Sequence, residues 1–283
     1  MRIPITSDKE PMILSLTLKS KVGKTPIRIR VADANKPGAF YTDRTGYLDG
    51  QQTFFVYMPR TPKLLIADVF EPDNEAYPQA DPVNFEVVDK KVSPIKKYPN
   101  EYAKNELIDC GVDFIQTFSE RAGILSAGEF GSTYKSDCGR FRIDYLDAII
   151  DREKEIPYSP QEPNKMVPNP NFGKEVETPA RISIDKGFIE VSKKFFLQYP
   201  IPQRIAILLH EISHFFINNN QHDELEADMN ALKIFLGNGY GPIDANNAFL
   251  EVFKNYPSDQ NVDRYMKLNN YLMDFVERNN IYK

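Results

Sequence analysis

Two of the three histidines in this chain of 283 residues lie four residues apart, with a glutamate directly after the first. The stretch reads His210-Glu211-Ile212-Ser213-His214. On a helix, residues i and i+4 share one face, so both imidazoles can point at the same spot. Neutral imidazoles are typical zinc ligands, and a glutamate beside the first one can take a proton from a metal-bound water. The spacing therefore predicts a Zn²⁺ site with Glu211 as its general base.

The residues around this motif are apolar. Ala206 to Leu209 lead into it, and Phe215 to Ile217 follow it, which is typical of a helix buried inside a domain. The alternative interpretation is a core helix that carries two incidental histidines. Buried polar groups without partners are costly, and a metal ion supplies partners. The apolar surroundings therefore favour the metal site.

A zinc site needs a third protein ligand, and the residues downstream offer several. The metzincin pattern H-E-x-x-H-x-x-G-x-x-H is excluded, because Ile217 replaces its glycine and Asn220 its third histidine. Glu224 and Asp228 are spaced i and i+4, so one helix face can present a ligand and a carboxylate for a histidine ring nitrogen. Glu226 is the alternative ligand. An acidic helix start that faces solvent is the alternative interpretation of all three carboxylates.

Together, H-E-x-x-H and the later E-x-x-A-D resemble the gluzincin metallopeptidases over about the last hundred residues, in a compact form with a short connection between the two motifs. Ala227 and Ala231 are similar to the small residues that let the two motif helices pack closely in that family. The resemblance implies three metal ligands, a general base and an aspartate that orients the first histidine: His210, His214, Glu224, Glu211 and Asp228. It also implies a peptide or protein substrate.

Composition excludes several classes of function. Hydrophobic residues make up 41% of the chain and charged residues 27%, as in soluble globular proteins. The net charge of −5 offers no basic footprint for nucleic acid or an anionic membrane. No apolar run approaches the roughly 20 residues of a membrane span. Lys9 to Pro11 interrupt any signal-peptide core, so we expect an intracellular or virion-associated protein.

The first 90 residues predict an all-β, sandwich- or barrel-like module, because short alternating segments are separated by Gly, Pro and Asp turns. Residues 91–100 predict a linker, and residues 101–283 a helical zinc domain with a small sheet, which makes the fold class α+β. Apolar residues at helical spacing predict a helix over 107–122, and Cys110 on its apolar stripe is interpreted as a small buried hydrophobe. Six prolines in 152–180 predict a long exposed loop.

Ala180 to Phe196 read as a hairpin around Asp185-Lys186-Gly187, just before the motif helix. This arrangement resembles the edge strand along which metallopeptidases bind an extended substrate, with ordinary supporting sheet as the alternative. Further helices are predicted around 243–254 and 259–277. Tyr240 and Tyr265 are candidate hydrogen-bond donors to a transition-state oxyanion, although aromatic packing is the simpler role for each.

The favoured hypothesis is a zinc metallopeptidase. The alternative is a structural or assembly protein of a tailed-bacteriophage virion, near the tail or portal, which uses a peptidase-like domain as a scaffold. The expected partners are then homo-oligomeric copies or other virion proteins, bound through the β module. Fold resemblance alone does not choose between the two.

Overall fold

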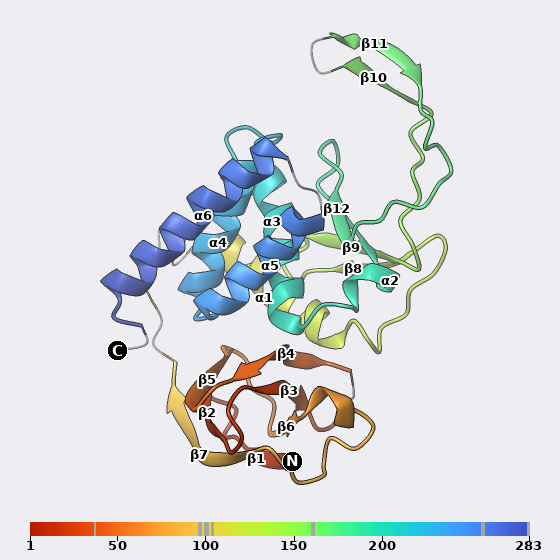
Figure 1. Cartoon of the computed structure of the whole chain (residues 1–283). Helices are drawn as coiled ribbons and strands as arrows, with labels where there is room; N and C mark the ends of the chain where they lie inside the picture. The colour runs from red at the N-terminus through yellow and green to blue at the C-terminus, as the bar shows by residue number, and fades with distance from the viewer. Residues whose placement is uncertain are drawn as a thin grey trace.

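The computed structural model describes residues 1–36, 38–95, 98, 102, 105–159, 162–255 and 258–281. It combines helices with small, mainly antiparallel sheets, as expected for the α+β class. In Figure 1 the N-terminal strands form the lower part of the molecule and the helices the upper part, and one hairpin projects from the upper part.

Seven N-terminal strands form two antiparallel sheets, with the orders β1-β6-β3-β4 and β5-β2-β7. Every second residue of β2 and β3 is buried, because alternate side chains of a strand point to opposite faces. The buried faces share one apolar core, to which Leu14, Leu16, Ile27 and Val31 contribute. The strands are β1 (Arg2–Thr6), β2 (Met12–Ser20), β3 (Thr25–Asp33), β4 (Phe40–Leu48), β5 (Gln51–Met58), β6 (Leu64–Phe70) and β7 (Phe85–Pro94).

The last of these strands differs from the sequence-based boundary. β7 pairs with β2 as far as Pro94, past the expected module end at residue 90 and into the predicted linker. The remainder of that linker contains residues outside the described part of the chain. The strand region also contacts the helices directly: Arg44 forms an ion pair with the buried Asp244, and Tyr57 packs so closely on Gly241 that a Cβ there would lie 2.5 Å from its ring.

Among the described residues, six α-helices and a four-stranded sheet of order β12-β13-β9-β8 build the rest of the body. All pairs in this sheet are antiparallel except β13 with β9. The helices are α1 (Glu106–Arg121), α2 (Lys193–Phe196), α3 (Ile201–Phe216), α4 (Glu224–Gly237), α5 (Pro242–Asn255) and α6 (Asp259–Arg278). The strands are β8 (Ser132–Lys135), β9 (Arg142–Leu146), β12 (Ala180–Ile182) and β13 (Ile189–Ser192). Helices α1, α4 and α5 all contact α3, which lies at the centre of the group.

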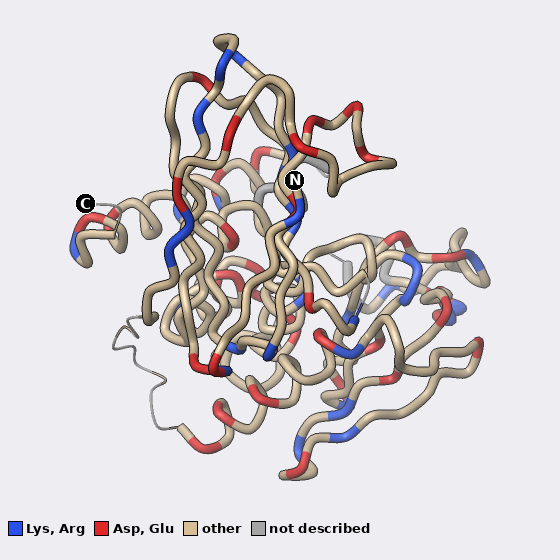
Figure 2. The backbone as a smooth tube through the Cα atoms, turned by 90° about the horizontal axis from the view of Figure 1, so that it is seen from below, with Lys and Arg blue, Asp and Glu red and all other residues tan. Residues whose placement is uncertain are grey.

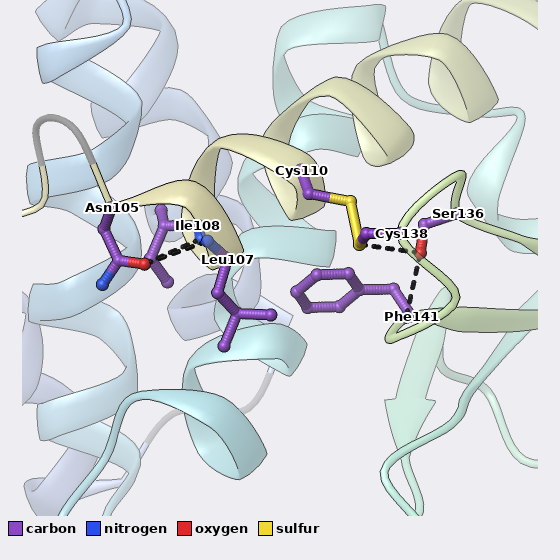
Figure 3. The surroundings of a disulfide bond; sticks show 7 residues. All are labelled: Asn105, Leu107, Ile108, Cys110, Ser136, Cys138 and Phe141. Carbon is purple, nitrogen blue, oxygen red and sulfur yellow. Dashed lines mark hydrogen bonds between the residues drawn. A yellow bond between two sulfur atoms is a disulfide. The ribbon is translucent and has the colours of Figure 1, made fainter.

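Helix α1 begins where the sequence predicts, because Asn105 caps it by accepting hydrogen bonds from the N–H groups of the first turn. A disulfide joins Cys110 on α1 to Cys138 in the turn between β8 and β9 (Figure 3). The interpretation of Cys110 as a mere buried hydrophobe is therefore wrong. Next to the bridge, Phe141 packs against Gly111, where a Cβ would lie 2.8 Å from its ring.

The proline-rich segment 152–180 is not a plain loop. It carries a two-stranded antiparallel hairpin, β10 (Glu155–Ser159) and β11 (Glu162–Pro168), which projects from the body in Figure 1. Both strands of an isolated hairpin are edge strands, and prolines are tolerated at edges because one side of each strand needs no hydrogen-bond donor. Proline content alone therefore predicted a loop where strands form.

Basic and acidic residues are scattered along the described backbone in Figure 2. In the described part of the chain, no helix combines the length and the apolar character that a bilayer crossing requires.

Candidate metal centre

The two motif histidines lie on one face of α3, and their Nε2 atoms face each other. Helix α3 begins with Pro202 in its first turn, where a missing N–H costs nothing. One turn of helix separates His210 from His214, and their Nε2 atoms are 3.0 Å apart. His214 is buried, and the side chain of His210 is 18% exposed. The exposed fraction of His210 matters because it leaves the pair accessible from the cleft described below.

The third member of the cluster is Glu224, the first residue of α4. Its Oε2 lies 3.4 Å from His210 Nε2 and its Oε1 lies 3.5 Å from His214 Nε2. Ligand atoms about 2.0–2.1 Å from a tetrahedral zinc ion lie about 3.3 Å from one another. Each Nε2 atom therefore lies at about the spacing of zinc ligands from the other Nε2 and from one Glu224 oxygen, and the three residues form a potential metal-binding group.

Hydrogen bonds to the Nδ1 atoms orient both rings. His210 Nδ1 lies 2.8 Å from Asp228 Oδ1, and His214 Nδ1 lies 2.8 Å from the backbone carbonyl of Gln221. Both acceptors favour the tautomer with hydrogen on Nδ1, which leaves the Nε2 lone pairs free to bind a metal. The sequence predicts the Asp228 contact. It gives no signal for the Gln221 carbonyl, because a main-chain group has no residue type to recognise.

Glu226, the alternative ligand, lies outside the cluster. Its carboxylate accepts hydrogen bonds from the backbone N–H groups of Asn219 and Asn220 and from the Asn219 side chain. It therefore fixes the connection between α3 and α4. Asparagine often ends a helix by adopting a left-handed conformation, but neither of these two residues has a positive φ. They act through hydrogen bonds instead.

Arg264 on α6 completes the surroundings of the cluster, and sequence reasoning missed it. Its Nε donates to Asp228 Oδ2 at 2.8 Å, and its NH2 group donates to Glu224 Oε2 at 3.1 Å. Asp228 therefore binds His210 with one oxygen and Arg264 with the other. No spacing rule links residues 36 positions apart on separate helices, so only the folded chain brings them together.

A cleft of about 900 Å³ opens beside the cluster, and Glu211 lines it together with both motif histidines. On one side lie β12 and the residues before it, and on the other lie α3 and α5. Strand β12 is the edge of its sheet, as the hairpin prediction expected. The turn before β13 lies close to α3: Gly187 has a φ of +67°, and a Cβ there would lie 2.6 Å from Phe215.

Several ionisable groups in the cleft have pKa values far from their ordinary ones. Burial and the neighbouring Glu224 raise the pKa of Glu211, although His210 and the Ile182 backbone N–H oppose the change. The hydrogen bond with His210 and the charges of the histidines and Arg264 lower the pKa of Glu224 to about 2. Burial lowers the pKa of His210, but hydrogen bonds to Asp228 and Glu224 outweigh burial and raise it to about 10. Glu224 is therefore an anion at neutral pH, and Glu211 has more affinity for a proton than an exposed glutamate.

The candidate oxyanion donors lie elsewhere. The buried Tyr240 accepts a hydrogen bond from Gln116 Nε2 at 2.8 Å and stacks on Phe235. Tyr265 packs against the apolar core. Neither lines the cleft, whereas the third histidine, His222, does. The positions of the two tyrosines fit packing roles.

Comparison of the chain with protein-family models, with curated proteins and with solved structures returned no match.

Proposed function

We propose that this protein is a zinc-dependent metallopeptidase of the gluzincin type. The observation that carries the proposal is the convergence of three side chains: the Nε2 atoms of His210 and His214 lie 3.0 Å apart, and the Glu224 carboxylate places Oε2 3.4 Å from the first and Oε1 3.5 Å from the second. Two imidazoles and one carboxylate form a catalytic zinc site when a further position stays open to the solvent. The cleft beside the cluster provides that opening.

Each side chain of the centre has a role that its position supports. His210, His214 and Glu224 would hold the metal, and Asp228 keeps His210 in the tautomer that binds it. When bound, the metal supplies Lewis acidity, which polarises the scissile carbonyl and lowers the pKa of the attacking water. Glu211 takes the proton of that water and later delivers it to the leaving amine. Its raised pKa suits a group that must both accept and return a proton.

The substrate class follows from the walls of the cleft. Among the described strands, β12 pairs only with β13. Its other edge, where the Ile182 N–H already donates to Glu211, can therefore bind an extended chain through its remaining main-chain groups. A polypeptide in an extended conformation offers that complementary edge. This supports hydrolysis of peptide bonds rather than of a small ester.

The test begins with zinc per chain in protein purified without added metal, followed by digestion of a peptide library. About one zinc per chain and cleavage abolished by a chelator are expected. Glu211→Gln is the matched variant, because it keeps the size of the side chain and removes the base. It should retain zinc and lose at least about 100-fold in cleavage rate, the lower range for general-base catalysis. A protein that takes up no zinc, or a Glu211→Gln variant that still cleaves normally, would contradict the proposal.

A further inference from the structure

The guanidinium of Arg264 binds two carboxylates of the metal centre at once. Its Nε and NH2 groups lie 2.8 Å from Asp228 Oδ2, and NH2 also donates to Glu224 Oε2 at 3.1 Å. The third nitrogen donates to Asn261 Oδ1 at 3.2 Å, one helical turn before Arg264 on α6. The side chain of Arg264 is 12% exposed and that of Asp228 is 2% exposed, so the bonds between them are largely shielded from water, whereas the Glu224 side chain is 44% exposed. Such a planar fork holds its acceptors in fixed directions, which a lysine ammonium cannot do.

The two oxygens of Glu224 are placed almost symmetrically toward the histidines. Oε2 lies 3.4 Å from His210 Nε2 and Oε1 lies 3.5 Å from His214 Nε2. Distance to the imidazoles therefore does not decide which oxygen binds a metal. The hydrogen bond from Arg264 does distinguish them, because it engages Oε2 alone.

The distinction has a chemical consequence. A carboxylate can bind a cation through one oxygen or through two. At a zinc ion with three protein ligands, a second carboxylate oxygen would fill the position that water or substrate must use. An oxygen that already accepts a charge-assisted hydrogen bond is a weaker donor to a metal.

We propose that Arg264 is a positioning residue that restricts Glu224 to coordination through Oε1 and so keeps one coordination position open for the reaction. This inference rests on the proposed zinc site. It adds that Arg264 determines how many ligand atoms surround the zinc, and not whether the zinc is retained. A simple tether of α6 to α4 would instead affect only folding and metal retention.

The test compares the zinc forms of the wild type, Arg264→Met and Arg264→Lys. Arg278→Met is the control, since Arg278 is an exposed arginine near the end of the same helix whose Nε donates to the Asp274 carbonyl. Three readouts are needed: zinc affinity by competition with a chelator, first-shell oxygen number by X-ray absorption, and kcat and KM on a peptide cleaved by the wild type.

In Arg264→Met we expect zinc affinity within about threefold of the wild type or tighter, one additional oxygen in the first shell, and kcat lower by about 10–100-fold, the usual effect of losing a group that orients a ligand. KM should change little. Arg264→Lys keeps the positive charge but lacks the planar guanidinium, so it should show the same additional oxygen in the first shell. If the methionine variant does not fold, the lysine variant provides the test. Arg278→Met should match the wild type.

A first shell unchanged in both Arg264 variants would overturn the inference, and so would loss of zinc from a folded Arg264→Met. In either case a zinc-loaded, active wild type would leave the proposed function standing. A wild type that binds no zinc would instead remove the proposed function, and this inference with it.

Discussion

Replacement of Asp228 by asparagine tests the buried end of the metal centre. The Asp228 side chain is only 2% exposed, and its two oxygens have different partners, His210 on one side and Arg264 on the other. Asparagine keeps the size and one acceptor oxygen. If that oxygen faces His210, the amide NH2 group faces Arg264. Hydrogen-bond donors then face each other at the position where the carboxylate oxygen of Asp228 accepts from Arg264. The reverse orientation places the NH2 group against His210 Nδ1 instead.

The magnitude follows from these two contacts. Replacing a charge-assisted hydrogen bond to His210 by a neutral one loses about 1 kcal/mol. Breaking a buried ion pair costs about 3–5 kcal/mol, and the lower end applies because Arg264 keeps Glu224 as a partner. We expect the free energy of unfolding of the metal-free protein to fall by about 3–4 kcal/mol, and the zinc affinity to fall by about 10–100-fold.

Urea denaturation of the metal-free protein measures the first quantity, and chelator competition measures the second. Asp263→Asn is the control, because Asp263 is an exposed residue of α6 that pairs with Lys267 on the surface. The control should stay within about 0.5 kcal/mol of the wild type. Equal stability and equal zinc affinity of Asp228→Asn and the wild type would refute the assigned contacts.

Three further predictions concern the ligand, the pH dependence and the disulfide. Glu224→Ala should abolish zinc binding in elemental analysis, whereas Glu226→Gln should retain one zinc per chain; the reverse result would make Glu226 the ligand. Burial raises the pKa of Glu120, so the folded protein binds its proton more tightly than the unfolded chain, and ionisation opposes folding as pH rises. Glu120→Gln should therefore gain stability relative to the wild type in urea denaturation as the pH rises above the ordinary pKa of a glutamate, about 4.5. The disulfide between Cys110 and Cys138 spans 28 residues, and its reduction should lower the free energy of unfolding by about 3–4 kcal/mol; an unchanged urea midpoint would contradict that estimate.

Local periodicity predicts the parts of the site that lie within one helix. The spacing of His210 and His214 puts both rings on one face regardless of tertiary structure, and the i, i+4 spacing does the same for Glu224 and Asp228. Periodicity does not decide whether Glu224 or Glu226 is the metal ligand. The first turn of α4 carries both carboxylates, next to the connection from α3, and the asparagine N–H groups that bind Glu226 are placed by that connection alone.

Residues that act across helices leave no comparable pattern. Arg264 is one of many basic residues in the sequence, and nothing near it in the chain indicates that α6 passes the start of α4. The projecting hairpin β10–β11 was missed for the opposite reason. Proline is a strong local signal against central strands, but it carries little weight for strands that pair with only one other strand.

The charged residues at the start of α4 argue for a working site over a scaffold. Asp228 and Glu224 both lie within hydrogen-bonding distance of Arg264, in a corner where the side chain of Asp228 is 2% exposed, that of Arg264 12% and that of Glu224 44%. Groups of buried charges contribute little net stability, and well-packed apolar side chains in their place are often more stabilising. An assembly protein would gain from an apolar corner between α4 and α6. The proposed metal centre would explain this corner, because Asp228 would orient a ligand ring and Glu224 would supply a ligand oxygen, which gives the burial of Asp228 and Arg264 a chemical reason.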